Sequence, residues 1–294
     1  RTRCRRLVHD PVAQARANLD QWMSRRWRRG ESAHWRKFNP RIASLDDLTT
    51  FRARNAEGGD VRLGLDDTRL DQHDLTSLIF QRLVSKWGIE CVRPLIESSI
   101  GRPPTTTIIP ADGDPVVVDF HDLHLINFAL DLHNALTRHV QSQPHPILEI
   151  GAGYGGTVAK LAQLMPTTKF VVADLPPAGL LQAYYLNRHF PGEVGVAPLG
   201  ALFASSCRFL ICSGEDLRQH PTEYQAVVNT RSFQEMERPT VKRYFSLIQD
   251  SLCTDGIRRS MDLRAIRTCV HATWYLESRD ETSRSSQSGL SNVV

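Results

Sequence analysis

Four glycines and two acidic residues gather around one turn near the middle of the sequence. Glu149 precedes the run from Gly151 to Gly156, in which four of the six residues are glycine. Glycine allows a sharp backbone turn and a close approach to a ligand, and the first N–H groups of a following helix have no partner within that helix. Asp174 comes 23 residues after Gly151, where a carboxylate can accept hydrogen bonds from ribose hydroxyls. The spacing predicts a site for a cofactor that contains a nucleoside.

Two classes of cofactor fit this turn. Gly151, Gly153 and Gly156 also satisfy the G-x-G-x-x-G pattern of dinucleotide-binding proteins, which predicts a dehydrogenase that uses NAD. A dinucleotide would place a pyrophosphate against the turn, and the carboxylate of Glu149 would repel it. S-adenosylmethionine has no phosphate, and it carries an ammonium and a sulfonium that the same carboxylate attracts. Glu149 therefore favours S-adenosylmethionine, unless it is only a surface acid at the end of a strand.

The elements around the turn are expected to alternate between strands and helices. Short apolar runs predict strands over 147–150, 169–173, 208–212 and 224–228. Helical periodicity predicts helices over 156–164, 177–189 and 239–252. Strands that alternate with helices form a parallel sheet with right-handed crossovers and helices on both faces. We therefore expect an α/β fold with a Rossmann-like sheet over residues 145–256.

A mainly helical region over residues 1–140 is expected to precede the sheet and to cover the substrate. Helix signals occur at four places in it: from Pro11 to about Gly30, from about Ser44, over 74–88, and over 121–140. Asp10 is typical of an N-cap, and Asp47 is placed as the capping-box partner of Ser44. Asp112-Gly113 predicts a hairpin between strands over 105–109 and 116–118. The polar, proline-broken stretch 141–146 indicates a linker.

The residues around the turn are similar to those of a known enzyme superfamily. The segment EIGAGYGG (149–156) resembles motif I of class I S-adenosylmethionine-dependent methyltransferases. More narrowly, the chain resembles a bacterial family of sugar O-methyltransferases in three segments: ILEIGAGYGGTVAKL (147–161), FVVADLPPAGLLQAYYL (170–186) and VVNTRSFQEMERPTVKRYF (227–245). Weaker matches are SAHWRKF (32–38) and LDDLTTFR (45–52). The resemblance covers residues 30–254 and implies a transfer of a methyl group to a hydroxyl of a sugar or glycoconjugate.

The resemblance also implies a set of cofactor-binding residues. They are Glu149, Gly151, Ala152, Gly153, Tyr154 and Gly155 at the methionine and ribose end, Asp174 and Leu175 at the ribose, Glu215 or Asp216 near the adenine, and Asn229 facing the transferred methyl group.

A sugar hydroxyl is a poor nucleophile near neutral pH, so a base or a metal is expected to act on it. The resemblance places Glu235 on the loop after the fourth strand, where it can take the proton while Asn229 faces the methyl group. Glu235 could equally be a cap at a helix start. His124, with His121 and Asp122, is a second source of a base or an Mg²⁺ ligand, unless the cluster is a solvated helix start. No residue is assigned as a metal ligand.

The composition is that of a globular protein. Of the 294 residues, 41% are hydrophobic and 23% are charged, which excludes wholesale disorder and fibrous classes. No run approaches the roughly 18 apolar residues of a membrane span, and the basic start lacks the apolar stretch of a signal peptide. Six scattered cysteines without a C-x-x-C pair predict reduced thiols and a cytoplasmic location. Because residue 1 is not Met, the chain reads as a fragment or a processed product.

Residues 257–294 depart from the expected pattern. A fifth strand should follow Gly256, but Arg258 and Arg259 do not suit a central strand that is buried on both faces. The stretch 277–288 has a disordered composition. We interpret the tail as foreign to the family, which would leave the sheet without its last strands and expose an edge.

Three functions therefore remain open. The first is an O-methyltransferase for a small-molecule sugar or glycan, which requires neither nucleic acid nor a membrane and for which a role in polysaccharide biosynthesis is expected. The second is an RNA methyltransferase that uses the arginine-rich N-terminal region. A net charge of +4 is a weak field, and Asn229-Thr230-Arg231-Ser232 is not the Asn-Pro-Pro-aromatic stretch of base-methylating enzymes. The third is a truncated chain that binds the cofactor without catalysis. The sequence leaves the oligomeric state open.

Overall fold

A computed structural model of the chain describes residues 10–24, 33–53, 72–110, 113–139, 145–198, 207–217, 223–230 and 232–251. Its helices are α1 (Pro11–Ser24), α2 (Ala33–Ala43), α3 (Gln72–Trp87), α4 (Ile89–Val92), α5 (Phe120–His139), α6 (Gly156–Leu164), α7 (Pro176–His189) and α8 (Arg238–Ser251), with short 3-10 turns η1 (Leu48–Thr50), η2 (Arg93–Leu95) and η4 (Ser232–Glu235). Its strands are β1 (Thr106–Ile108), β2 (Val116–Val118), β3 (Ile147–Ile150), β4 (Phe170–Asp174), β5 (Val194–Val196), β6 (Phe209–Ser213) and β7 (Ala226–Val228).

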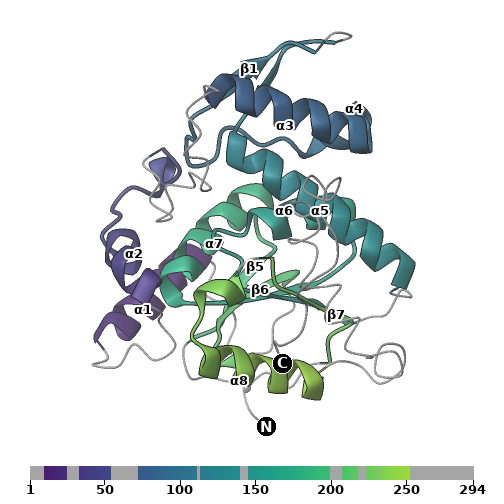
Figure 1. The fold of residues 1–294 in the computed structure, drawn as a ribbon. Coiled ribbons are helices and arrows are strands. Elements are labelled where there is room, and N and C mark those ends of the chain that lie inside the picture. The colour runs from purple at the N-terminus through teal and green to yellow at the C-terminus, as the bar shows by residue number, and fades with distance from the viewer. Residues whose placement is uncertain are drawn as a thin grey trace, which may run out of the picture.

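Five of these strands form a parallel sheet in the order β5-β6-β4-β3-β7 (Figure 1). Within this part of the chain, β3 is an inner strand between β4 and β7, and all four of its side chains are buried. They alternate between two apolar clusters: Ile147 packs with residues of α6 and α7, and Leu148 and Ile150 pack with Ile248 of α8. Helices therefore cover both faces, and the predicted Rossmann-like α/β fold is confirmed.

The strand order reverses direction between β3 and β7. Along the chain, β3, β4 and β6 add side by side in one direction, and β7 then returns to the other side of β3. In open α/β sheets, the crevice at the carboxyl ends of the strands on either side of such a reversal is the usual place for a ligand. The glycine turn follows β3, so it lies at this reversal.

The N-terminal helices pack directly on the sheet layer. Helix α1 lies against α7 and β5, and α5 lies along α6. Ala15, Leu19 and Trp22 of α1 belong to the same apolar cluster as the sheet residues Ile147 and Phe170. A further cluster joins α3, the β1–β2 hairpin and α5, which form the upper layer in Figure 1. Within the described residues, the apolar core thus continues across the predicted boundary near residue 140.

Two sequence predictions need correction. The helix expected to start at Ser44 is wrong, because α2 ends at Ala43 and the Ser44 hydroxyl donates to the Arg41 carbonyl oxygen, as at a helix end. Asp47 does act as a cap, but for the 3-10 turn η1, where it accepts a hydrogen bond from Thr49 N at 2.8 Å. Strand β5 was not predicted at all. The expectations for residues 25–30, 141–144 and 252–294 lie outside the described residues.

The other helices, the hairpin and the four predicted strands are present, with ends shifted by at most a few residues. None of the helices in the described ranges is long and apolar enough to cross a membrane.

Candidate functional site

The turn after β3 is locked to the loop after β7. Asn229 Nδ2 and Ser232 Oγ both donate to the carbonyl oxygen of Ile150, at 2.8 and 3.1 Å. Gly151 has a φ of +71°, and a Cβ atom there would collide with the Ser232 side chain. Gly153, two residues on, has a φ of +58° and open space where its Cβ would lie. The turn is thus closed toward β7 at Gly151 and open at Gly153, where a ligand can approach the backbone.

We expect Gly151→Ala to lower the free energy of unfolding by about 1–3 kcal/mol more than Gly192→Ala does. Gly192 is a matched control, because its φ of +79° carries similar strain but a Cβ there meets nothing. Urea unfolding followed by circular dichroism measures both. Equal losses at the two positions would show that Ser232 does not fill the space above Gly151.

Glu149 is a buried acid and not a surface one. Its side chain is 2% exposed in the central strand, so the surface interpretation is wrong. Within the described chain its Oε1 atom is buried without a hydrogen-bond partner, while the Thr230 side chain bonds to the carboxylate. Burial, with the nearby charge of Asp174, raises the pKa of Glu149 from 4.5 to about 8. A buried, unpartnered oxygen beside the glycine turn fits a cationic ligand group.

Asp174 ends β4 and holds the glycine turn from the other side. It accepts hydrogen bonds from Leu175 N at 2.7 Å, Gly153 N at 3.2 Å and Gln182 Nε2 at 2.9 Å. Burial nonetheless raises the pKa of Asp174 from 3.8 to about 7, and the charge of Glu235 adds to this rise. Three carboxyl groups therefore share this edge of the sheet.

The remaining expected cofactor residues fall into two groups. Ala152 and Leu175 are half-buried at the same edge, and a small cavity beside Asp174 and Leu175 is lined also by Ser213. Tyr154 is different, since its ring is 2% exposed and packs edge-on against Phe51, so it could meet a cofactor through its backbone alone.

The acids after β6 point different ways. Asp216 is buried and accepts a short hydrogen bond from the Ser213 hydroxyl, whereas Glu215 is exposed. Neither arrangement assigns an adenine contact.

The expected catalytic residues lie in two places. Glu235 ends η4, and its Oε2 accepts a hydrogen bond from Trp35 Nε1 at 3.1 Å. Asn229 holds the β3 turn, as described above. His124 lies on α5 with its ring against Phe120, and its Nε2 atom is buried. The structure thus brings Glu235 and Asn229 to the sheet edge. It places His124 away from them on α5, the helix that packs along α6. No group of three or more His, Cys, Asp or Glu side chains within the described ranges could hold a metal ion.

Sequence reasoning missed residues of the N-terminal region that reach this edge. Ala15 and Asn18 of α1 line the cavity beside Asp174, and Asn18 Nδ2 donates to the Ala197 carbonyl oxygen at 2.7 Å. Trp35 reaches Glu235 across 200 residues of sequence. The match of 32–38 to a family segment was the available signal for Trp35, but nothing local in α1 indicated a ligand.

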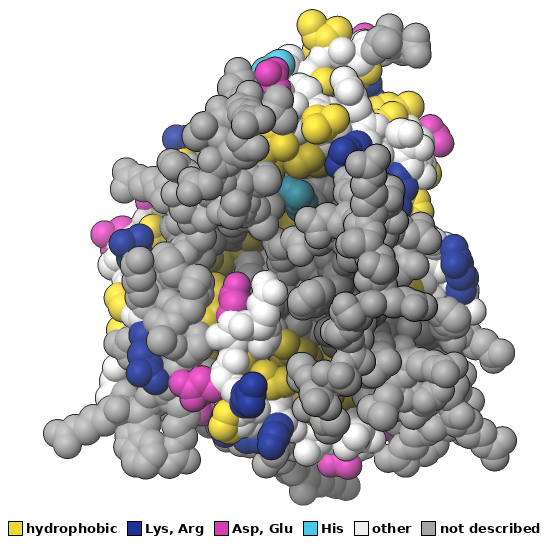
Figure 2. Space-filling view, viewed as in Figure 1, with side chains coloured by type: hydrophobic (Ala, Val, Ile, Leu, Met, Phe, Trp, Pro, Cys, Tyr) yellow, Lys and Arg dark blue, Asp and Glu magenta, His cyan; other side chains and the backbone are white. Residues whose placement is uncertain are grey.

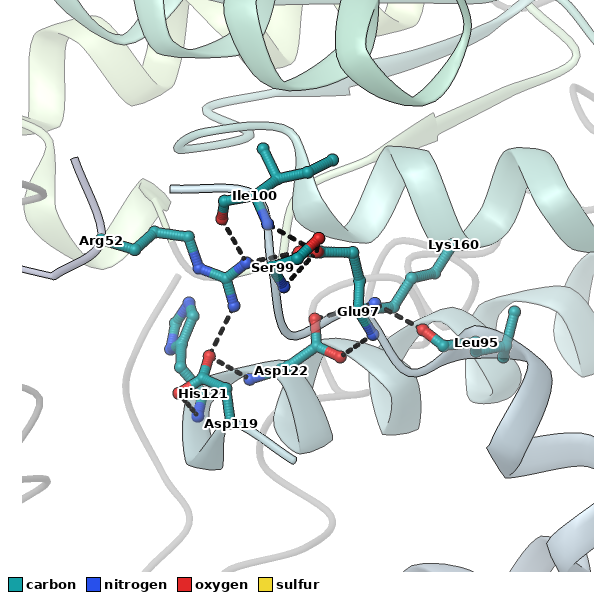
Figure 3. A network of polar contacts seen from close by, with 9 residues as sticks. All are labelled: Arg52, Leu95, Glu97, Ser99, Ile100, Asp119, His121, Asp122 and Lys160. Atoms are coloured by element: carbon teal, nitrogen blue, oxygen red, sulfur yellow. Dashed lines mark hydrogen bonds and ion pairs between the residues drawn. The ribbon is translucent and has the colours of Figure 1, made fainter. Parts of the chain in front are cut away.

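A buried ionic cluster joins the N-terminal region to α6, the helix that follows the glycine turn (Figure 3). It consists of Arg52, Glu97, Asp119, Asp122 and Lys160. Arg52 pairs with Glu97 at 2.7 Å and with Asp119 at 2.6 Å. Its guanidinium also lies 5.2 Å from the centre of the Tyr154 ring. Lys160 on α6 is fully buried and contacts Asp122 Oδ1 at 2.8 Å and the Leu95 carbonyl oxygen at 2.7 Å. The cluster holds the turn and its helix against the N-terminal region.

Comparisons with known proteins found no matching family model and no matching curated protein. Among solved structures, the chain is similar to the pyocyanin biosynthetic protein PhzM, with 16% identity, a TM-score of 0.34, and coverage of 47% of this chain and 37% of that one. Coclaurine N-methyltransferase, bound to N-methylheliamine and SAH, has 13% identity and a TM-score of 0.31, over 83% of this chain and 56% of that one.

An O-methyltransferase family 2 protein from Planctomyces limnophilus, in complex with apigenin, has 14% identity and a TM-score of 0.30, over 84% of this chain and 75% of that one. The chain thus spans little more than a third of PhzM and just over half of the second protein. All three TM-scores are low, so we take the class of the protein from its own strand order. The parallel sheet with helices on both faces defines a Rossmann-like α/β protein.

Proposed function

We propose that this chain binds S-adenosylmethionine and transfers its methyl group to a hydroxyl of a small-molecule acceptor, a sugar or glycan. The observation that carries the proposal is the buried Oε1 of Glu149, which no described residue bonds, beside a glycine turn at the reversal of the sheet. An acidic, partly dry site favours a ligand with positive charge and disfavours one with a pyrophosphate. This supports S-adenosylmethionine over NAD.

The residues at the sheet edge would divide the cofactor between them. Glu149 would face the cationic methionine end, and the backbone at Gly153 would lie against the ligand. Asp174 would accept hydrogen bonds from the ribose hydroxyls, since its position at the end of β4 adjoins the turn. Leu175 and Ser213 would border the nucleoside through the cavity that they line.

When bound, S-adenosylmethionine supplies a methyl group already activated by the sulfonium. The protein's own task is then to place the acceptor oxygen in line and to remove its proton. Glu235 is half-buried at the end of η4, on the loop that follows β7, and is the base in this proposal. Asn229 keeps the β7 loop against the turn, so it positions Glu235 relative to the cofactor. The sugar acceptor rests on the resemblance of residues 147–161, 170–186 and 227–245, and a role in polysaccharide biosynthesis is proposed on the same basis. A cytoplasmic location is proposed from the scattered cysteines.

Calorimetric titration of the purified chain tests the cofactor. We expect S-adenosylmethionine to bind and NAD to give no heat, because only the former matches the carboxylates of the site. Binding of NAD alone would reverse the assignment of Glu149. Binding of neither, by a chain that still unfolds cooperatively, would contradict the proposed function.

An RNA substrate is the second candidate, and the arginine-rich stretches on which it depends, 1–6 and 25–29, lie outside the described residues. On the face shown in Figure 2, the described Lys and Arg side chains are dispersed among Asp and Glu and form no continuous basic patch. Nucleic-acid affinity depends mainly on clustered cations that neutralise phosphates. A steep loss of RNA binding with increasing salt would favour this candidate over the sugar.

A further inference from the structure

The contact between Trp35 and Glu235 joins two parts of the chain that no motif connects. Trp35 Nε1 donates to Glu235 Oε2 at 3.1 Å, across 200 residues of sequence. The Trp35 ring is half-buried and packs against the main apolar cluster, and α2 lies along α7. Glu235 is fixed at its other side, since η4 begins at Ser232, which is bonded to β3. The indole therefore approaches the carboxylate from a rigid support.

The hydrogen bond from Trp35 occupies one oxygen of the Glu235 carboxylate and leaves the second oxygen open. Within the described residues, the hydrogen bond to Oε2 is the contact that holds this side chain, and Oε1 has no bonded partner. The charge of Glu235 adds to the rise in the pKa of Asp174, so the two carboxyl groups lie near the same edge of the sheet. A held carboxylate with one open oxygen is arranged to accept a proton.

The chemistry of the donor is also informative. An indole has a single N–H donor and no charge. It can orient a carboxylate without placing a positive charge beside it, whereas Arg or Lys would favour the ionised form strongly and weaken it as a base. The neighbouring Arg36 lies on the same helix but contacts Glu237, at 3.9 Å and with both side chains exposed. The charged Arg36 side chain thus pairs at the exposed surface, and the neutral indole of Trp35 donates to Glu235.

We propose that Trp35 is a positioning residue, which orients Glu235 so that its second oxygen accepts the proton of the acceptor hydroxyl. This inference rests on the proposed function. It assigns to α2 an indirect part in catalysis, through Glu235, and it gives a reason for the contacts of α2 with the loop that follows β7.

An assay of methyl transfer tests the inference. It offers S-adenosylmethionine and a panel of monosaccharides and oligosaccharides to the protein, and it measures the S-adenosylhomocysteine that is released. Trp35→Phe keeps an aromatic ring and removes the donor, and we expect it to lower kcat about 10- to 100-fold. Glu235→Gln should lower kcat about 10²- to 10⁴-fold, the usual contribution of a general base. The dissociation constant for S-adenosylmethionine should stay within about twofold in both variants.

The double variant separates positioning from a structural role. If Trp35 acts through Glu235, Trp35→Phe has no further effect in the Glu235→Gln background, because residues that act as a unit are not additive. Arg36→Gln is the matched control on the same helix and should retain wild-type kcat, since its ion pair is exposed. Additive losses, or full kcat in Trp35→Phe, would overturn the positioning role.

The indole N–H signal of Trp35 gives a second readout that needs no acceptor. In protein with ¹⁵N-labelled tryptophan, the resonance that Trp35→Phe removes reports the contact with the Glu235 carboxylate, and it should move to a different position in Glu235→Gln. An indole resonance whose position is unchanged in Glu235→Gln would disprove the contact. If the wild-type chain binds S-adenosylmethionine but methylates none of the sugars, the acceptor class fails and the catalytic role of Trp35 fails with it, even where the contact is confirmed.

Discussion

Replacing Lys160 with Met is expected to lower the free energy of unfolding by about 3–5 kcal/mol. Lys160 and Asp122 are 0% and 1% exposed and lie 2.8 Å apart, so removal of the ammonium leaves a carboxylate buried without its counter-charge. Urea unfolding at pH 7 measures the loss. Burial already raises the pKa of Asp122 despite Lys160, and without Lys160 it should rise further. The folded variant would then hold a proton that the unfolded chain releases, so the loss should grow as the pH rises.

The matched control is Lys86→Met. Lys86 also pairs with an aspartate, Asp131, at 2.9 Å, but the two side chains are 40% and 27% exposed, and such pairs contribute about 0–1 kcal/mol. The double variant Lys160→Met/Asp122→Leu removes both buried charges and should recover part of the lost stability. Equal losses for Lys160→Met and Lys86→Met would show that the ionic cluster does not hold the N-terminal region in place.

The parts of the fold that could be predicted are those that depend on local sequence. The helix predicted over 156–164 matches α6 because a glycine turn and an apolar period mark its start and its face. Strand β5 has three residues with a central glycine, Gly195, and so carries too little pattern to be recognised. Asp47 was recognised as a cap, but after a single turn the Arg52 N–H donates to the Gly101 carbonyl oxygen, and this tertiary hydrogen bond takes the place of a helical one.

In the site, too, the features set by local sequence could be predicted, and those set by distant contacts could not. The position of Glu149 and Asp174 around the glycine turn follows from spacing and was predicted. Their protonation could not be, because it depends on burial by segments far away in the sequence. Arg52 and Trp35 lie in the two segments that match the family only weakly, and their partners lie 45 to 200 residues away. Such contacts are set by how the N-terminal helices pack on the sheet, which no local pattern encodes.

The affinity for S-adenosylmethionine is expected to increase with pH, about tenfold between pH 6 and pH 7, because Glu149 must ionise. Glu149 has a pKa of about 8 in the unliganded protein, so it carries a proton near pH 7. The cationic ligand binds the ionised form, and the proton must therefore be released. Above about pH 8 the group is ionised already, and the dependence on Glu149 should end. Calorimetry at pH 7 in phosphate and in Tris, which differ in ionisation enthalpy, counts the released protons.

Glu149→Gln tests the same group in two directions. It should weaken binding of S-adenosylmethionine at pH 7.5 by about 10- to 100-fold, since a charge-assisted contact of about 1.5–3 kcal/mol is lost, and it should reduce the number of protons released.

The unliganded Glu149→Gln variant should be more stable than the wild type at pH 8. A raised pKa means that the wild-type folded state keeps a proton that the unfolded state loses above about pH 4.5, so wild-type stability falls as the pH rises between 4.5 and about 8. Glu90→Gln on α4, an exposed acid, should change neither property. Equal affinities for wild type and Glu149→Gln across this pH range would show that Glu149 does not face the cation, and the site would then lose its preference for S-adenosylmethionine over NAD.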